Sequence, residues 1–250
     1  MLALRGYGVL ALGVAYAVRG DGNLDAGAHR VNDRLQGERG AGRRVELGGM
    51  VRFVDGEAVA VKLREFRRLL AAHPWRVVGL AEAGWRGDLD EPGDTYVENA
   101  LAKAAMVSAA LTLPAIADDS GIEVDALRGW PGPRSARWLG DGAGDAERLA
   151  ALIAEVDRLS PDDRRVRYVC VVALCRPGAQ PVTARGECLG VLVGPRGSRG
   201  FGYDPAFLSD DLGLTFGEAD DASKDGVSHR ARALARLMES GVLDPAPEAG

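Results

Sequence analysis

The chain has 250 residues, of which 46% are hydrophobic and 27% charged, as is usual for a globular protein with one substantial domain or two lobes. Its 31 basic and 36 acidic residues give a formal charge of −5, which argues against a broad surface for nucleic acid or anionic membranes. No stretch approaches the roughly 20 consecutive apolar residues of a membrane helix. We therefore expect neither a nucleic acid nor a membrane as a partner.

The first 49 residues differ in character from the rest. Residues 1–18 contain Arg5, an apolar stretch and the sequence Ala15-Tyr16-Ala17, which together satisfy the pattern of a signal peptide. A single arginine is a weak basic region, so we expect a cytoplasmic protein and keep export as the alternative. Residues 19–49 are rich in Gly, Arg and Asp and have neither the helical nor the strand period. We predict a poorly ordered extension at 1–49, a main domain at 50–240 and a disordered tail at 241–250.

Helical and strand patterns begin after this extension. Leu63, Phe66, Leu69 and Leu70 share one face of a helix predicted over 61–72, with arginines on the other face. Residues 75–82, "WRVVGLAE", are typical of a strand. The order of these elements indicates the start of an α/β domain.

A second helix is indicated by a capping box and an alanine-rich segment. Thr95 and Glu98 have the capping-box spacing, and the helix should end before Pro114. Asp90 and Glu91 lie just before its start. Acidic residues there either stabilise the positive end of the helix or take a catalytic role, and the pattern alone leaves both open.

Residues 116–125, "IADDSGIEVD", place two adjacent aspartates after an apolar run. Asp118, Asp119, Ser120 and Gly121 are residues that favour a tight turn after a short buried strand. The alternative is that the strand end fixes two carboxylates at the rim of a cleft, where they could bind a divalent cation or accept a proton.

The second half of the chain adds further strands and helices. A helix is predicted over 145–159, and two valine-rich runs at 164–176 and 183–194 are predicted to form an adjacent pair of strands. A last helix should begin near Ser228. Because no helix separates the two strands, the expected fold is α/β with a central mixed sheet and flanking helices. The three cysteines lack CxxC spacing and are expected to be reduced core residues: Cys170, Cys175 and Cys188.

Two further segments concentrate polar and aromatic residues. In "GFGYDP", glycines flank Phe201 beside Tyr203 and Asp204, which suits stacking on a planar ring, although a buried aromatic corner would have the same composition. In "SKDGVSHR", Lys224 and the pair His229-Arg230 cluster near a helix start, which favours anions; a solvated basic face is the alternative. With "ADDSG", these segments have the residue types that bind a nucleotide phosphate chain with its magnesium ion.

Four segments resemble the signature blocks of the Ham1-like inosine triphosphate pyrophosphatase family. They are "TYVENALAKA", "LPAIADDSGIEVDALRGWPGPRSARW", "GFGYDPAFL" and "SHRARAL", and the similarity runs from about Lys62 to Leu237. The resemblance implies a two-lobed fold and hydrolysis of ITP, dITP or XTP to the monophosphate and pyrophosphate. It also implies a Mg²⁺ cofactor and a cytosolic homodimer that cleanses the nucleotide pool.

The resemblance also implies roles for particular residues. Asp119 would be the general base and a magnesium ligand, with Asp90 or Glu91 completing the metal site. The remaining positions would bind the substrate. Lys224 would neutralise phosphate or contact the base, Lys62 would be the lysine of the phosphate loop, and Ser120 would also contact the substrate. The purine would be held by Phe201, Gly202, Tyr203 and Asp204, and its six-position oxygen would be read by His229 and Arg230.

One departure from the family pattern concerns the phosphate-binding loop. The family has S/T-x-N-x-x-K between its first strand and helix, whereas this chain has "EAVAVK" at 57–62. Either the chain is a true variant with weakened phosphate binding, or residues 1–61 come from a shifted reading frame or wrong start. The changed loop makes a catalytically impaired nucleotide-binding protein one functional alternative. Another is a related nucleotide pyrophosphatase of the septum-inhibitor type, which shares the architecture but would not need "SHR".

Overall fold

The computed structural model describes residues 8–12, 15–16, 57–73, 75–85, 89, 91, 93–140 and 142–243. The chain divides into two compact units. The first comprises Met1–Glu91, Leu101–Ala117 and Leu174–Pro181, and the second comprises Pro92–Ala100, Asp118–Ala173 and Val182–Gly250. Within the described residues, no helix is long and apolar enough to cross a membrane. Most of the predicted extension and tail lies outside the described residues.

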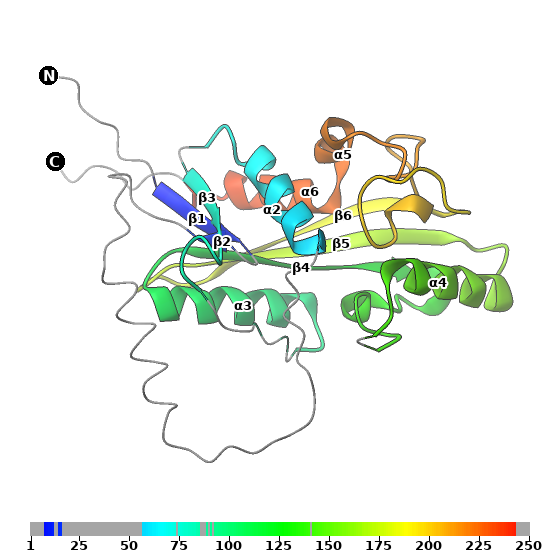
Figure 1. The fold of residues 1–250 in the computed structure, drawn as a ribbon, viewed down its shortest axis with the longest axis horizontal. Coiled ribbons are helices and arrows are strands. Elements are labelled where there is room, and N and C mark those ends of the chain that lie inside the picture. The colour runs from blue at the N-terminus through cyan, green and yellow to red at the C-terminus, as the bar shows by residue number, and fades with distance from the viewer. Residues whose placement is uncertain are drawn as a thin grey trace, which may run out of the picture. The chain divides into compact units, whose positions relative to one another are not determined.

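The first unit contains a small mixed sheet. Its strands β1 (Gly8–Leu12), β2 (Ala15–Tyr16) and β3 (Trp75–Gly79) are joined by the start of β4 (Ala115–Val124), in the order β3-β1-β2-β4. Strand β1 runs parallel to β3 and also pairs with β4, whereas β2 is antiparallel to β1. Figure 1 shows β1 and β3 side by side.

One amphipathic helix, α2 (Glu57–Leu69), packs against β3 in this unit. Phe66 and Leu70 are buried, which confirms the predicted apolar face. Arg67 donates from Nε to the carbonyl of Val77 at 3.1 Å, so a side chain from the polar face also anchors the helix to the strand. Strand β3 ends at Gly79, three residues earlier than expected, because a turn follows at 80–84.

The second unit contains the larger part of the sheet, in the order β4-β5-β6-β7. The predicted strand pair is confirmed as β5 (Arg165–Cys175) and β6 (Val182–Leu192), which are neighbours, and the short β7 (Phe207–Ser209) is antiparallel to β6. Helix α4 (Asp145–Leu159) has the predicted bounds, and Figure 1 shows it on one face of these strands with α6 (His229–Glu239) on the other. The expected mixed α/β sheet with flanking helices is therefore confirmed.

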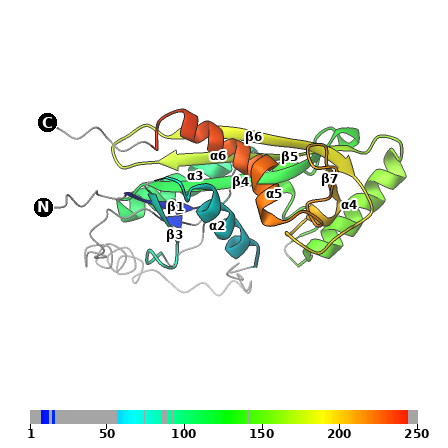
Figure 2. The same cartoon turned by 90° about the horizontal axis from the view of Figure 1, so that it is seen from above.

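The core of the second unit is formed by apolar residues of α4, the strands and the loops after them. Members with no more than 2% exposure are Ile122, Val124, Leu152, Val156, Val166, Cys188, Leu192, Ala206, Phe207 and Phe216. All three cysteines are reduced and buried, as predicted. Helix α6 lies along β6, as Figure 2 shows.

Two local expectations were wrong, and one helix was missed. Residues 118–121 form the interior of β4 and not a turn, because β4 is paired within the sheet and distant side chains satisfy its carboxylates. Residues 57–62 form the first turns of α2 and not a loop, consistent with a segment of Ala, Val, Glu and Lys without Gly or Pro. A further helix, α5 (Asp221–Val227), was not predicted, because its Asp, Ser and Gly residues favour turns.

Candidate functional site

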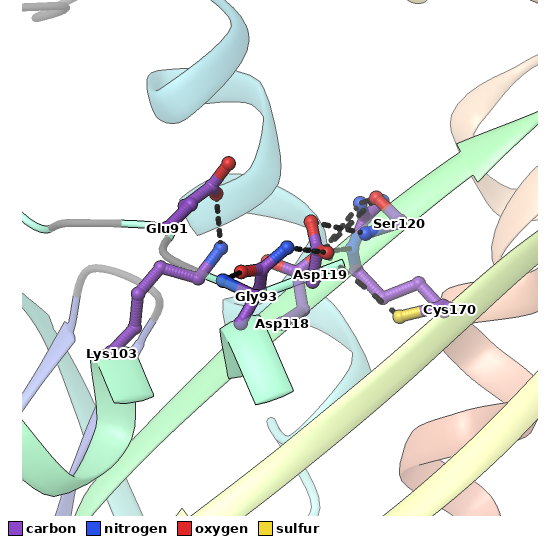
Figure 3. A network of polar contacts seen from close by, with 9 residues as sticks. Glu91, Gly93, Lys103, Asp118, Asp119, Ser120 and Cys170 are labelled. Atoms are coloured by element: carbon purple, nitrogen blue, oxygen red, sulfur yellow. Dashed lines mark hydrogen bonds and ion pairs between the residues drawn. The ribbon is translucent and has the colours of Figure 1, made fainter. Parts of the chain in front are cut away.

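Asp118, Asp119 and Ser120 lie at successive positions of β4, as Figure 3 shows. Successive side chains of a strand point to opposite faces of the sheet. Asp118 and Ser120 therefore share one face, and Asp119 points to the other. Both carboxylates are buried, with 2% exposure for Asp118 and 6% for Asp119. Asp118 and Asp119, although adjacent in the chain, are therefore buried on opposite faces of the sheet.

Asp118 is part of a buried ion pair. Arg230, the second residue of α6, donates to Asp118 Oδ2 from Nη2 at 3.0 Å and from Nε at 3.3 Å, and their side chains are 1% and 2% exposed. Arg230 Nη2 also donates to Ser120 Oγ at 3.3 Å. The Cys170 thiol lies 4.0 Å from Asp118 Oδ2, as drawn in Figure 3. The guanidinium therefore connects the start of α6 to β4.

A close backbone approach brings α6 to the sheet. A Cβ atom at Gly186 of β6 would collide with the carbonyl of His229 and with the backbone of Arg232 and Ala233. The helix therefore lies directly on the strand at a residue without a side chain. Ser228 caps α6 by accepting a hydrogen bond from Ala231 N at 3.2 Å, which confirms the predicted helix start.

Asp119 accepts a hydrogen bond on each of its oxygens. Asn99 Nδ2 donates to Asp119 Oδ2 at 3.0 Å, and the backbone N–H of Ser120 donates to Asp119 Oδ1 at 3.1 Å. Asn99 is fully buried, and its Oδ1 accepts a hydrogen bond from Gly93 N at 2.8 Å. One amide side chain therefore links the carboxylate to the segment that precedes α3 (Tyr96–Leu111).

The predicted capping box fixes the start of α3. Thr95 N donates to Glu98 Oε2 at 3.1 Å, and Glu98 N donates to Thr95 Oγ1 at 3.2 Å. Asn99 follows directly in the first turn of the helix. The local sequence thus determines where the amide that holds Asp119 is placed.

Asp204 is the centre of a second buried cluster. Its Oδ2 accepts hydrogen bonds from Lys224 Nζ at 2.7 Å and from Phe201 N at 2.9 Å, and its Oδ1 accepts one from Tyr168 Oη at 3.1 Å. Asp204 is 2% exposed. Gly200 has φ of 74°, and a Cβ atom there would collide with the Asp204 carboxylate, so this turn requires glycine.

Aromatic rings surround the cation of this cluster. Lys224 Nζ lies 5.5 Å from the ring centroid of Phe201 and 5.3 Å from that of Phe216, which is within cation–π range. Tyr168 stacks on His229 with centroids 4.6 Å apart and planes 15° apart. Burial, and then the charge of Asp204, raise the pKa of Tyr168 well above its ordinary value, so its hydroxyl remains a donor.

Helix α4 supports the loop between Phe201 and Asp204. The side chain of Asp145 accepts a hydrogen bond from Gly202 N at 2.8 Å. Tyr203 Oη accepts from Trp138 Nε1 at 2.7 Å and donates to the carbonyl of Ser135 at 2.7 Å. Burial raises the pKa of Tyr203 to about 12. Each residue of the aromatic loop, 201–204, therefore has at least one hydrogen bond, either within the loop or to another part of the second unit.

The other predicted site residues lie in the first unit or outside the described residues. Lys62 is half-buried in α2. Glu91 Oε1 accepts a hydrogen bond from Lys103 Nζ at 2.6 Å, with side chains 33% and 7% exposed, as Figure 3 shows. Asp90 lies outside the described residues. Among the residues described, no group of three or more His, Cys, Asp or Glu side chains could hold a metal ion by itself.

The structure thus brings the predicted site residues of the second unit into two clusters that meet at the start of α6. Asp119 and Ser120 are next to Asp118 on β4, while Lys224, Phe201 and Asp204 form the second cluster. The contacts of Asn99 with Asp119 and of Tyr168 with Asp204 were not predicted. The capping box one residue before Asn99 was the only local signal that could have indicated its position.

Comparison with known proteins places this fold and this acidic strand in a recognised class. The sequence model of the Ham1 family matches residues 59–240. The chain therefore belongs to the Ham1 family.

Individual relatives agree with this assignment. The chain is 41% identical over 191 residues to a protein of Geobacter sulfurreducens named dITP/XTP pyrophosphatase, with 76% of this chain and 96% of that protein covered. It is 47% identical over 179 residues to one of the same name from Symbiobacterium thermophilum, covering 71% and 88%. The structure of a HAM1 protein from Coxiella burnetii superposes with a TM-score of 0.66 and 35% identity, covering 72% of this chain and 93% of that one.

Proposed function

We propose that this chain hydrolyses the non-canonical purine nucleoside triphosphates dITP, XTP and ITP to the monophosphate and pyrophosphate, and thereby removes them from the nucleotide pool. The names of its relatives support the substrate class, since they align over most of both chains. The reaction is a hydrolysis of a phosphoanhydride, for which a positioned base and a held phosphate chain are the main requirements.

The different environments of Asp118 and Asp119 are the observation that supports this proposal best. The charge of Asp118 is balanced by Arg230, which suits a structural role. Asp119 accepts hydrogen bonds from the neutral amide of Asn99 and a backbone N–H. These two hydrogen bonds engage both oxygens of the carboxylate and so fix its orientation. Asp119 is therefore the residue that we assign as general base.

In the proposed reaction, Asp119 accepts a proton from a water molecule whose oxygen attacks phosphorus. The bond between that phosphorus and the bridging oxygen of pyrophosphate breaks, and pyrophosphate leaves. Asn99 fixes the carboxylate through its contact with Gly93, so the acceptor oxygen has one orientation. Such a positioned base contributes about 10²–10⁴-fold to a rate.

Mg²⁺ is the cofactor that we propose. Its preferred ligands are oxygen atoms, and it usually binds through one or two carboxylates together with substrate phosphates. We assign Asp119, together with Glu91 or Asp90, as its carboxylate ligands, as the family resemblance implies. When bound, the ion would neutralise negative charge on the triphosphate.

Purine recognition is assigned to the second cluster. Phe201, which is half-buried, is proposed to stack on the purine beside the ammonium of Lys224, in a loop with Gly202 and Tyr203. His229 and Arg230 at the start of α6 are proposed to donate hydrogen bonds toward the six-position oxygen. A purine with an oxygen at that position accepts a hydrogen bond that adenine cannot, which provides discrimination. Ser120 and Lys62 are proposed to contact the phosphate chain.

The cellular setting is proposed on the same basis. We infer a cytoplasmic homodimer, because the substrates belong to the intracellular nucleotide pool and the resemblance noted above implies that assembly. The net charge of −5 makes binding to nucleic acid or an anionic membrane unfavourable. The division into an extension at 1–49, a catalytic domain at 50–240 and a tail at 241–250 belongs to the same proposal.

One observation favours a second candidate, an impaired nucleotide-binding protein. Residues 57–62 are helical and lack the hydroxyl and asparagine side chains of the family's phosphate loop. The loss of several such hydrogen bonds, each worth about 0.5–1.5 kcal/mol, would weaken phosphate binding. This candidate predicts binding of ITP without turnover.

The experiment that separates the two candidates is pyrophosphate release from dITP, XTP, ITP and ATP by the full chain with Mg²⁺. The proposed enzyme releases pyrophosphate from the first three and discriminates against ATP. Asp210→Asn is the matched control for Asp119→Asn, because Asp210 is an exposed carboxylate paired with Arg165 in the same unit. Binding of ITP without pyrophosphate release would instead establish the second candidate.

A further inference from the structure

The purine cluster contains a buried carboxylate whose contacts are all made within the protein fold. Asp204 is 2% exposed and accepts hydrogen bonds on both oxygens. The donors come from three separate segments: β5 through Tyr168, the aromatic loop through Phe201 N, and α5 through Lys224. Both oxygens of Asp204 are therefore already engaged by donors of the protein itself.

The groups held by Asp204 are those best suited to contact a base. Phe201 is half-buried, and its backbone N–H donates to the carboxylate at 2.9 Å. The ammonium of Lys224 is fixed at 2.7 Å and lies over the Phe201 ring. Tyr168, fixed at 3.1 Å, stacks on His229 and so limits the positions of the imidazole.

We propose that Asp204 is a positioning residue that holds Phe201, Lys224 and, through Tyr168, His229 in one arrangement for base recognition without touching the substrate. This inference rests on the proposed function, because it assigns the cluster to the base of the nucleotide. It differs from direct recognition in its consequences: removing the charge should disturb base selection and loop order together, and should leave the hydrolytic step intact.

The test uses Asp204→Asn and the milder Tyr168→Phe in the full chain. Asparagine keeps the shape but removes the negative charge that pairs with the buried Lys224 ammonium. Phenylalanine keeps the ring stacked on His229 but removes the hydroxyl donor. Because hydrogen bonds to charged groups are the stronger ones, we expect Asp204→Asn to raise KM for dITP and XTP about ten- to hundredfold. Tyr168→Phe should raise it less. Discrimination against dATP should fall in both variants, with kcat nearly unchanged.

A second readout needs no nucleotide. The segment 194–200 is exposed, and trypsin can cleave after Arg199, two residues before the N–H that Asp204 holds. We expect cleavage of folded Asp204→Asn at this bond to be about tenfold faster than in the parent protein, measured by mass spectrometry. Asp210→Asn, which alters an exposed carboxylate paired with Arg165, should match the parent in both assays.

The outcomes separate this inference from the proposed function. Unchanged KM and selectivity in both variants, or a fall in kcat alone, would overturn the positioning role. If the parent protein hydrolyses none of the nucleotides, the proposed function fails, and the trypsin assay alone then decides: an unchanged cleavage rate rejects the role of Asp204. If Asp204→Asn does not fold, the KM and selectivity of Tyr168→Phe decide.

Discussion

Removal of one partner of the buried ion pair between Asp118 and Arg230 should strongly destabilise the second unit. Arg230→Met would remove the cation that pairs with the Asp118 carboxylate, which is 2% exposed, and Asp118→Val would remove the anion that pairs with the guanidinium, which is 1% exposed. Asp118→Val/Arg230→Met removes both charges and fills the space with apolar atoms.

The magnitude follows from this burial. Breaking a buried pair by removing one partner costs about 3–5 kcal/mol, whereas replacing both by apolar residues is often close to neutral. Against a total stability of about 5–15 kcal/mol, each single variant should lose a large fraction of its free energy of unfolding. The double variant should lose less than either single variant.

Urea unfolding, followed by circular dichroism and tryptophan fluorescence, measures these losses. Arg165→Met is the matched control, because Arg165 also pairs with a carboxylate through two hydrogen bonds, yet both side chains are more than 40% exposed. That variant should lose no more than about 1 kcal/mol. If Arg230→Met loses no more than Arg165→Met, or if the two single losses add in the double variant, the assigned ion pair is wrong.

Three other outcomes are expected. Asp119→Asn should lower turnover on dITP at least about 10²-fold without changing the urea midpoint, and wild-type turnover would reject Asp119 as the base. Excess EDTA should abolish pyrophosphate release, which should return with added Mg²⁺; full activity in EDTA would contradict the metal site. Burial raises the pKa of Tyr203 to about 12, so the neutral form is favoured in the folded state. Its contribution to stability is complete below about pH 10 and is lost as pH rises toward 12, so Tyr203→Phe should lose less stability than the parent protein over this range in urea unfolding.

Local signals were sufficient for much of the fold. The bounds of α4, the capping box of α3 and the start of α6 at Ser228 depend on residues within a few positions of one another. Valine-rich runs likewise identified β5 and β6, whose side chains are mostly buried. These elements were predicted because the propensity of the segment and its place in the sheet agree.

The site itself depends on contacts that no local pattern contains. Asp118 and Asp119 favour a turn, yet β4 continues through them because Arg230, 112 residues later, and Asn99, 20 residues earlier, satisfy the carboxylates. Tertiary partners thus override the turn preference. The resemblance to the family indicated which residues gather, whereas their division into an ion pair, a held base and an aromatic cluster required the structure.

Gly186 has a consequence for how sequence variants of this protein should be interpreted. The strand and α6 meet backbone to backbone at this residue, so their separation does not depend on the size of any side chain. Replacement by alanine, which looks harmless by chemical similarity, would move the helix away and withdraw the guanidinium of Arg230 from Asp118. A glycine with no chemistry of its own would then produce the same phenotype as loss of the arginine. Screens that score substitutions by residue similarity would rank this position too low.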